Sequence, residues 1–270
     1  TRNSVDGIIY DTVRPAVVSY EVFSANSIKI ILSEYIDNAQ LQTLTNYNLN
    51  NGLGNPISSV DSANRLILTF SANLDSSLVY ILTIQNLTDC SGNIMTTASL
   101  QIIFYTPSAG DIVMNEIFAD PSPQINLPNG EFIELKNNKN IPVNLNGWTF
   151  SDAATTVTIS NIIIPADSFI VLCPNTLVDS FAARGFTNIV ISGVSSLPSL
   201  NNSRDSLTLK DNNGNIIDQV NYSDTWYRDT LKKAGGWTLE RIDPTTSCGE
   251  GLNWTASNDI NGGTPGFRNS

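Results

Sequence analysis

Histidine does not occur anywhere in the 270 residues of the chain. Because histidine is the commonest general base in enzymes and the commonest neutral metal ligand in proteins, its absence excludes whole classes of active site. A hydrolase with a Ser-His-Asp triad, a protease with a Cys-His pair and a zinc site with histidine ligands are all excluded. We therefore predict that the chain by itself is not an enzyme.

Positive charge is scarce as well. The chain has 14 lysines and arginines against 25 aspartates and glutamates, which gives a formal net charge of -11. Four basic and eight acidic residues precede Gly110, and 10 basic and 17 acidic residues follow it, so neither half is basic. Nucleic-acid binding draws most of its affinity from Lys and Arg, which excludes nucleic acid as a partner. The same repulsion disfavours an anionic membrane surface.

Long apolar runs are missing too. No run approaches the roughly 20 residues that a membrane-spanning helix needs, so we expect no transmembrane segment. The chain begins with Thr1 rather than Met and carries no signal peptide. This start is typical of a mature or excised segment of a longer protein.

Only three cysteines are present, Cys90, Cys173 and Cys248, and they are too few and too scattered for a zinc cluster. One disulfide and one free thiol would suit an exported protein, and three unrelated small apolar residues are the alternative. Cys173 ends an apolar segment and Cys248 lies in the loop before Trp254. Our hypothesis is that Cys173 and Cys248 form a disulfide that ties the C-terminal segment to its domain and leaves Cys90 free.

Hydrophobic residues alternate with other residues through much of the chain, as in residues 28–32 and 66–70. Alternation with period two predicts strands with one buried face. Asn-Gly and Gly-Asn turn signals separate these runs, and short strands at such spacing are typical of a β-sandwich. The one helix that the pattern predicts covers residues 176–183 and ends before Gly185.

A linker-like stretch at residues 106–110 divides the strand pattern in two. We predict an all-β protein with two tandem immunoglobulin-like β-sandwich domains, at residues 14–108 and 109–270. Residues 1–13 are either a tail or the remnant of a preceding domain.

The first half carries a strand followed by Ser-Glu, an apolar residue and Asp at residues 30–37, and a late strand and turn at residues 78–93. These motifs resemble the bacterial Ig-like domains of S-layer and adhesin proteins. Tyr80 could place its hydroxyl on a neighbouring main-chain group, as in a tyrosine corner, and Asp89 could accept turn amides. Glu34 and Asp37 could suggest a metal, but we favour solvated loop carboxylates.

The second half resembles the bacterial lamin-tail domain, an Ig-like sandwich. The motifs that carry the resemblance are, in order, residues 112–121, 130–137, 143–152, 205–222, 237–242, 253–257 and 263–269. The resemblance implies a non-catalytic module that accompanies secreted or surface hydrolases.

Several structural roles follow from the residues of this half. Trp148 should fill the sandwich core, and residues 211–215 should form a hairpin turn rather than a calcium loop. Thr264, Pro265 and Phe267 could clamp the irregular C-terminal segment onto the body. A partly buried ion pair between Glu240 and Arg241 could pin the same segment.

The best candidate site is acidic and consists of Glu116, Asp120, Glu131 and Glu134. Four carboxylates could supply the oxygen ligands that calcium prefers, so calcium is the possible metal here. We expect no other cofactor. Glu131 and Glu134 fall on opposite faces of a strand unless a bulge intervenes, and Glu116 meets Glu134 only if the register allows it. Solvated or ion-paired carboxylates are the alternative. A glycosidase also uses paired carboxylates, but two small sandwiches seldom provide a cleft for one.

Trp226 and Tyr227 could stack on a sugar or belong to the core, and the sequence does not decide between these roles. We predict non-catalytic structural or binding modules of a larger secreted or cell-surface bacterial protein, supporting adhesion, substrate binding or assembly. The alternative is a calcium-dependent accessory or catalytic part of an extracellular hydrolase. The expected partner is an extracellular protein or carbohydrate, and the expected state is a monomer within a larger multidomain chain.

Overall fold

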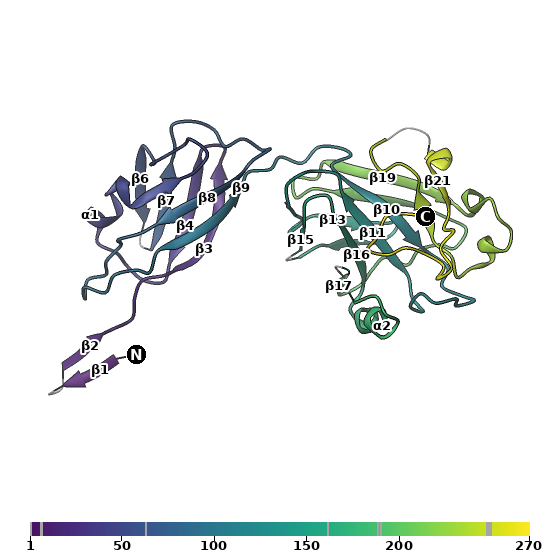
Figure 1. The fold of residues 1–270 in the computed structure, drawn as a ribbon, viewed down its shortest axis with the longest axis horizontal. Helices are drawn as coiled ribbons and strands as arrows, with labels where there is room; N and C mark the ends of the chain where they lie inside the picture. The colour runs from purple at the N-terminus through teal and green to yellow at the C-terminus, as the bar shows by residue number, and fades with distance from the viewer. Residues whose placement is uncertain are drawn as a thin grey trace. The chain divides into compact units, whose positions relative to one another are not determined.

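The computed structural model describes residues 2–5, 8–62, 64–160, 162–187, 189, 191–246 and 250–270. The chain divides into two compact units, Thr1–Thr106 and Pro107–Ser270, and the division falls at the start of the predicted linker. Strands dominate both units, which confirms the all-β prediction (Figure 1). In the described part of the chain, no helix has the length and hydrophobicity of a membrane span.

The first unit pairs a four-stranded sheet, β3-β4-β7-β6, with a three-stranded sheet, β5-β8-β9, and the β1-β2 hairpin precedes both. Its elements are β1 (Arg2–Val5), β2 (Ile8–Asp11), β3 (Val17–Ser24), β4 (Ser27–Leu32), α1 (Asn38–Leu41), η1 (Leu44–Asn46), β5 (Tyr47–Leu49), β6 (Ser58–Ser62), β7 (Arg65–Thr69), β8 (Val79–Ile84) and β9 (Ala98–Ile103).

Alternate residues of these strands form the core of the first unit. Ile28, Ile30 and Leu32 of β4 are buried in one apolar cluster with Leu82 of β8. The predicted tyrosine contact is confirmed, because the hydroxyl of Tyr80 accepts a hydrogen bond from a main-chain N–H, that of Asp75, at 2.9 Å.

The second unit contains a six-stranded sheet, β17-β16-β11-β10-β20-β21, a four-stranded sheet, β14-β13-β18-β19, and the short pair β12-β15. Its elements are β10 (Ile112–Phe118), β11 (Phe132–Asn137), β12 (Val143–Asn144), β13 (Thr149–Ser151), β14 (Thr156–Thr158), β15 (Ile163–Ile164), β16 (Phe169–Pro174), η2 (Asn175–Leu177), α2 (Val178–Ala183), β17 (Ile191–Val194), β18 (Arg204–Lys210), β19 (Ile216–Ser223), η3 (Asp224–Tyr227), η4 (Lys232–Ala234), β20 (Leu239–Arg241), η5 (Glu250–Asn253) and β21 (Trp254–Ala256).

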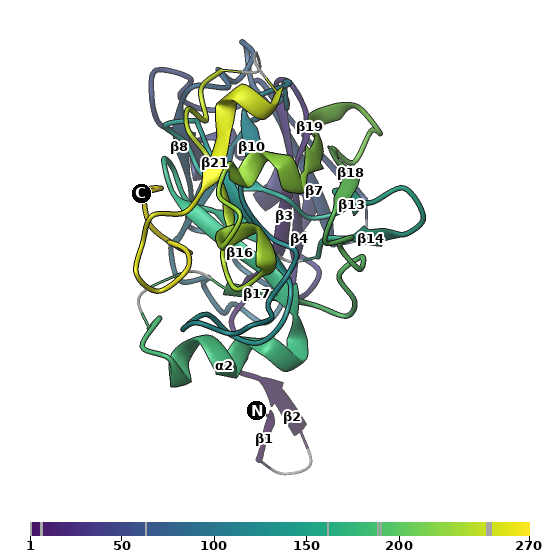
Figure 2. The same cartoon turned by 90° about the vertical axis from the view of Figure 1, so that its right-hand side faces the viewer.

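The predicted helix is confirmed as η2 and α2, and the chain turns after it at Gly185, which has a φ of 88°. The helix connects β16 to β17, and the two strands run parallel, as a crossover of this length permits. Figures 1 and 2 both place α2 beside β17 at one end of the six-stranded sheet. Phe181 of α2 packs there against Phe132 of β11, with ring centroids 5.5 Å apart.

Two further predictions hold in the second unit. Trp148 is buried, as expected for a ring in the sandwich core. Residues 211–215 form a turn in which one carboxylate oxygen of Asp211 accepts the N–H groups of Asn213 (2.9 Å) and Asn215 (2.8 Å). The carboxylate therefore serves the hairpin, as predicted.

Every residue of β10 and β11 is buried, although alternation sends neighbouring side chains to opposite faces of the sheet. One face supplies apolar residues such as Ile133 and Leu135. The other face supplies Phe132, Glu134 and Lys136 in the same strand. Two buried faces mean that something other than the partner sheet covers the charged residues.

Candidate functional site

Three glutamates form a row across the middle of the six-stranded sheet. Glu116 of β10 lies directly opposite Glu134 of β11 in one ladder and directly opposite Glu240 of β20 in the other. Side chains at paired positions project from the same face of a sheet, so the three carboxylates are neighbours. All three residues have 0% exposure. We call Glu134, Glu116 and Glu240 the glutamate row.

A β-bulge sits beside the row. The ladder between β10 and β11 shifts register between Met114 and Glu116, which leaves Asn115 as the extra residue. The side-chain amide of Asn115 donates to Glu134 Oε1 at 2.8 Å, so Asn115 and Glu116 both reach the face that holds the row. The register that the sequence left open is therefore the one that brings Glu116 to Glu134.

The C-terminal strap, which we define as residues 263–270, covers the row. The main-chain N–H of Thr264 donates to Glu116 Oε1 at 2.9 Å, and that of Gly266 donates to Glu134 Oε2. The N–H of Ser270 donates to Glu240 Oε2 at 2.8 Å. Each glutamate thus accepts one main-chain N–H of the strap.

Side chains strengthen this attachment. The hydroxyl of Thr264 donates to Glu240 Oε1 at 2.8 Å, and Pro265 is buried, as predicted for a clamp. The prediction is wrong for Phe267, whose side chain is 54% exposed. The strap is bound through polar acceptors in the sheet, and its one large apolar side chain faces solvent.

Burial makes ionised carboxylates costly in the row. Burial raises the pKa of Glu116 to about 8, and the negative charges of Glu240 and Asp259 act in the same direction. Burial, followed by the charge of Glu116, raises the pKa of Glu134 as well. Glu116 Oε1 also accepts from the hydroxyl of Thr238 at 2.5 Å, whereas its buried Oε2 has no hydrogen-bond partner among the described residues.

Arg241 does not pair with Glu240, contrary to our prediction. Successive strand residues point to opposite faces, and Arg241 Nη1 lies 3.0 Å from Asp218 Oδ2 on the side away from the row. Both side chains of this ion pair are buried. The guanidinium also donates to the main-chain oxygen of Met114 at 3.1 Å and lies 5.7 Å from the ring of Trp254.

The other two residues of the predicted calcium set lie outside the row. Glu131 is half-buried and its Oε2 accepts the N–H of Leu200 at 2.9 Å, while Asp120 Oδ1 accepts the N–H of Ser122 at 3.3 Å. The structure therefore brings Glu116 and Glu134 together and leaves Asp120 and Glu131 elsewhere. Calcium binding at these residues stays a prediction.

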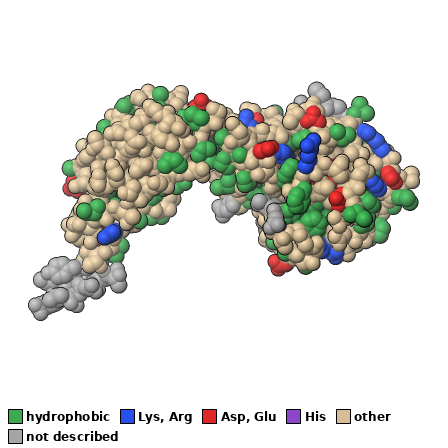
Figure 3. Space-filling model, in the orientation of Figure 1, with side chains coloured by type: hydrophobic (Ala, Val, Ile, Leu, Met, Phe, Trp, Pro, Cys, Tyr) green, Lys and Arg blue, Asp and Glu red, His purple; other side chains and the backbone are tan. Residues whose placement is uncertain are grey.

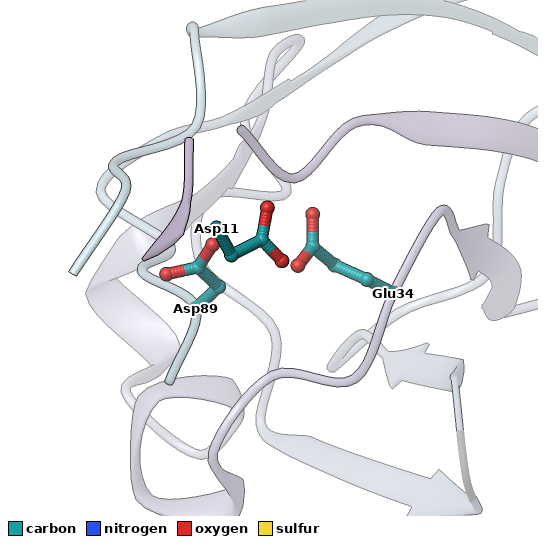
Figure 4. Close-up of side chains that lie close together, drawn as sticks. All are labelled: Asp11, Glu34 and Asp89. Carbon is teal, nitrogen blue, oxygen red and sulfur yellow. The ribbon is translucent and has the colours of Figure 1, made fainter. Parts of the chain in front are cut away.

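A different acidic group lies in the first unit. Carboxylate oxygens of Asp11, Glu34 and Asp89 all lie within 4.8 Å of one another. Figure 4 shows the three side chains converging from separate segments of the chain. Burial, followed by the charges of Asp89 and Asp11, raises the pKa of Glu34. Asp37 is not a member, because its carboxylate accepts the N–H of Ala39 at the start of α1.

Asp89 in this group already has partners. Its Oδ1 accepts the N–H groups of Ser91 and Asn93, both at 2.8 Å, which confirms the predicted turn role. Burial opposes ionisation of Asp89, but these hydrogen bonds outweigh it and lower the pKa. The group offers oxygen atoms that suit a hard cation, and it also has a structural explanation.

A cavity of about 770 Å³ lies beside the strap. Its acidic lining residues are Asp167, Glu240 and Asp243. Asp167 is paired with Lys136, and Asp243 accepts from the hydroxyl of Thr245 at 2.6 Å. Glu240 is held by the strap. The cavity thus has carboxylates in its wall, but all three already serve other groups.

Tyr227 belongs to the core, whereas Trp226 is half-buried, so a stacking role of Trp226 stays a prediction. Tyr227 is buried and donates its hydroxyl to the main-chain oxygen of Trp237 at 3.0 Å. Trp226 stacks on buried Trp254 with centroids 6.3 Å apart.

The disulfide hypothesis is not tested by the structure. Cys173 is buried, which raises the pKa of its thiol to about 11, and Cys90 is exposed. Cys248 lies outside the described residues, so its pairing with Cys173 stays a prediction.

Two small sandwiches, mostly of antiparallel strands, define a pair of immunoglobulin-like domains. The family model of the bacterial Ig-like domain matches residues 10–106, and that of the lamin tail domain matches residues 106–224. The chain therefore contains a bacterial Ig-like domain followed by a lamin tail domain. Both families agree with the resemblances seen in the sequence.

Among solved structures, the chain is similar to the N-terminal part of the bacterial S-layer protein SbsC, at 13% identity and a TM-score of 0.33, over 78% of this chain and 44% of that one. It is also similar to the S-layer protein rSbsC(31-844), at 17% identity and a TM-score of 0.32, over 76% of this chain and 33% of that one. The chain thus spans less than half the length of either. The comparison with curated proteins gives no match.

Proposed function

We propose that the two domains are a non-catalytic part of a larger bacterial protein that works outside the cell, where they hold and present binding surfaces. The observation that carries the proposal is the use of the glutamate row. Each of its members is buried and accepts a main-chain N–H from the strap. Carboxylates that hold the chain together in this way are not available as a general acid, a base or a nucleophile.

The remaining chemistry supports the same proposal. The chain contains no histidine. Bacterial Ig-like domains are modules of surface proteins in the family that this chain resembles, which supports an extracellular or cell-surface location. On the face drawn in Figure 3, Lys and Arg side chains occur singly or in small groups, which agrees with a partner other than nucleic acid. We propose an extracellular protein or a carbohydrate as that partner.

Activity assays on the purified chain test the non-catalytic role. We expect no turnover of polysaccharide, peptide or phosphodiester substrates, with or without added calcium. Turnover that disappears in a Glu116→Gln variant would overturn the proposal. Turnover that appears only with calcium would favour the alternative, a calcium-dependent part of a hydrolase.

Binding assays test the presenting role. The chain should sediment with cell-wall polysaccharide or with surface protein from a bacterium that encodes it, and antibodies should label it on intact cells. Retention in the cytoplasm would contradict the proposed location. A chain that binds neither class of material would contradict the proposed partners.

A further inference from the structure

The cavity of about 770 Å³ lies on the side of the six-stranded sheet that carries the glutamate row. Its lining includes Lys136 of β11, Glu240 of β20 and Thr255 of β21, which is directly opposite Glu240 in the ladder. The end of the strap, residues 268–270, and the loop after β20, residues 242–245, line it as well. Its volume falls within the range of about 300–1,000 Å³ that is typical of sites for small ligands.

The main chain around the cavity has few groups to offer a ligand. The N–H of Ile242 donates to the main-chain oxygen of Asn253 at 2.8 Å, and the N–H of Asp243 donates to Asn253 Oδ1 at 2.9 Å. The main-chain oxygen of Asp243 accepts from Asn253 Nδ2 at 2.9 Å. β20 itself is paired on both sides, with β10 and with β21. A peptide that binds by adding a strand needs an open ladder, so this cavity does not suit one.

The groups that remain available are side chains. Arg268 is exposed, and among the described residues it forms no ion pair or hydrogen bond. The hydroxyl of Thr255, which is half-buried, likewise has no hydrogen-bond partner in the described part of the chain. Ile242 is 56% exposed and Phe169 is half-buried, so both present apolar surface to the cavity. The carboxylates of the wall, in contrast, already serve other groups.

One cation without a partner favours a ligand that carries one carboxylate. The net charge of -11 opposes any anion, but screening limits this opposition to about 8 Å at physiological ionic strength. A nucleic acid or a membrane surface needs many cations spread over a wide area, whereas a small ligand with a single carboxylate needs only Arg268. The overall acidity of the chain is therefore compatible with such a ligand.

We propose that the cavity binds a short acidic saccharide, whose carboxylate pairs with Arg268 and whose sugar ring lies against Ile242 and Phe169. The C–H groups of a sugar ring cover apolar side chains, and its hydroxyl groups can bond to the hydroxyl of Thr255. This inference rests on the proposed role of the chain in binding extracellular material, and it names the chemical class of the ligand and the place where it binds.

Three probes of similar size test the proposal, each titrated into the wild-type chain and followed by ligand-observed NMR. The first is cellobiouronic acid, in which glucuronic acid is linked to glucose. The second is cellobiose, which has a neutral CH₂OH group in place of the carboxylate. The third is a blocked tripeptide of glycine, glutamate and glycine, which has a carboxylate but no sugar ring. We expect cellobiouronic acid to bind and the other two to bind much more weakly.

Variants locate the binding. Arg268→Gln should weaken the binding of cellobiouronic acid roughly tenfold, because it removes the charged partner of the carboxylate. Ile242→Asp should have a larger effect, because it places a like charge in the cavity. The matched control is Arg204→Gln, which removes an exposed cation of β18 in the other sheet and should leave the affinity unchanged. All three side chains are exposed, and an unchanged urea midpoint verifies that each variant folds.

Equal affinity for cellobiose would overturn the role of the carboxylate, and stronger binding of the tripeptide would overturn the choice of a saccharide. An affinity that is the same in Arg268→Gln as in the wild type would mean that the ligand binds elsewhere, and it would overturn the proposed site. If no probe binds while the chain still sediments with bacterial surface material, this inference fails and the proposed function stands. If the chain binds neither the probes nor that material, both fail.

Discussion

Arg241→Met should be among the most damaging single substitutions in the lamin tail domain. The guanidinium of Arg241 lies 3.0 Å from Asp218 Oδ2, and both side chains are buried. Methionine keeps the apolar stem but leaves the carboxylate of Asp218 with only main-chain donors, among them the N–H of Met114 at 2.8 Å. It also removes the donor to the main-chain oxygen of Met114.

The size of the effect follows from the burial of the pair. Removing one partner of a buried ion pair costs roughly 3–5 kcal/mol, because the remaining charge stays in a medium that solvates it poorly. For a domain of this length, that loss lowers the melting temperature by about 10 °C. The matched control is Lys233→Met, which breaks a more exposed pair with Asp224 and should cost less than about 1 kcal/mol.

Urea unfolding followed by tryptophan fluorescence measures this domain alone, because all four tryptophans lie after residue 107. Burial raises the pKa of Asp218 even beside Arg241. A carboxyl group whose pKa is raised in the folded state contributes stability at low pH, and this contribution is lost as the pH rises. Arg241→Met removes the positive charge that favours ionised Asp218, so this loss should be larger in the variant. The loss of unfolding free energy caused by Arg241→Met should thus be larger at pH 7 than at pH 4.5. Adding Asp218→Asn to the variant should reduce that loss. An equal deficit at both pH values would refute the buried-charge explanation.

Three further results are expected. Raising the pH from 6 to 9 should lower the free energy of unfolding of the domain in urea by about 3 kcal/mol. The reason is that the pKa of Glu116 is about 8 in the folded state and near 4.5 in the unfolded state. In the Glu116→Gln variant this pH dependence should be much smaller. Gly263→Ala should lower the urea midpoint, because its Cβ would lie 2.5 Å from Glu116 Oε1; an unchanged midpoint would contradict the close packing. If Cys173 and Cys248 are linked, denatured unreduced protein should titrate one thiol, that of Cys90, and three thiols would disprove the link.

Local patterns predicted much of the fold. Alternation placed Ile28 and Ile30 on one buried face, and Asp-Asn-Asn-Gly-Asn at residues 211–215 predicted a hairpin turn that the structure contains. The tyrosine contact of Tyr80 followed from its place near the start of a late strand. Each of these features depends on residues within a few positions of one another, which is why one sequence was enough to predict them.

The site depends on register, which a single sequence does not reveal. Glu116 meets Glu134 only because the bulge at Asn115 shifts the ladder, and Glu240 joins them from a strand more than a hundred residues away. The sequence indicated Glu240 as an anchor for the C-terminal segment but paired it with the wrong partner. The group of Asp11 and Asp89 with Glu34 had no local signal at all, because it forms between three separate segments.

The place of β20 has a practical consequence for anyone who produces this domain. The lamin tail family model stops at residue 224, but β20 pairs with β10 on the side opposite β11. A fragment that ended at residue 224 would turn β10 into an open edge strand with unpaired main-chain groups. It would also leave Glu116 and Glu134 without the strap that covers them. Such a fragment is expected to aggregate, whereas one that extends to residue 270 keeps the sheet closed on that side.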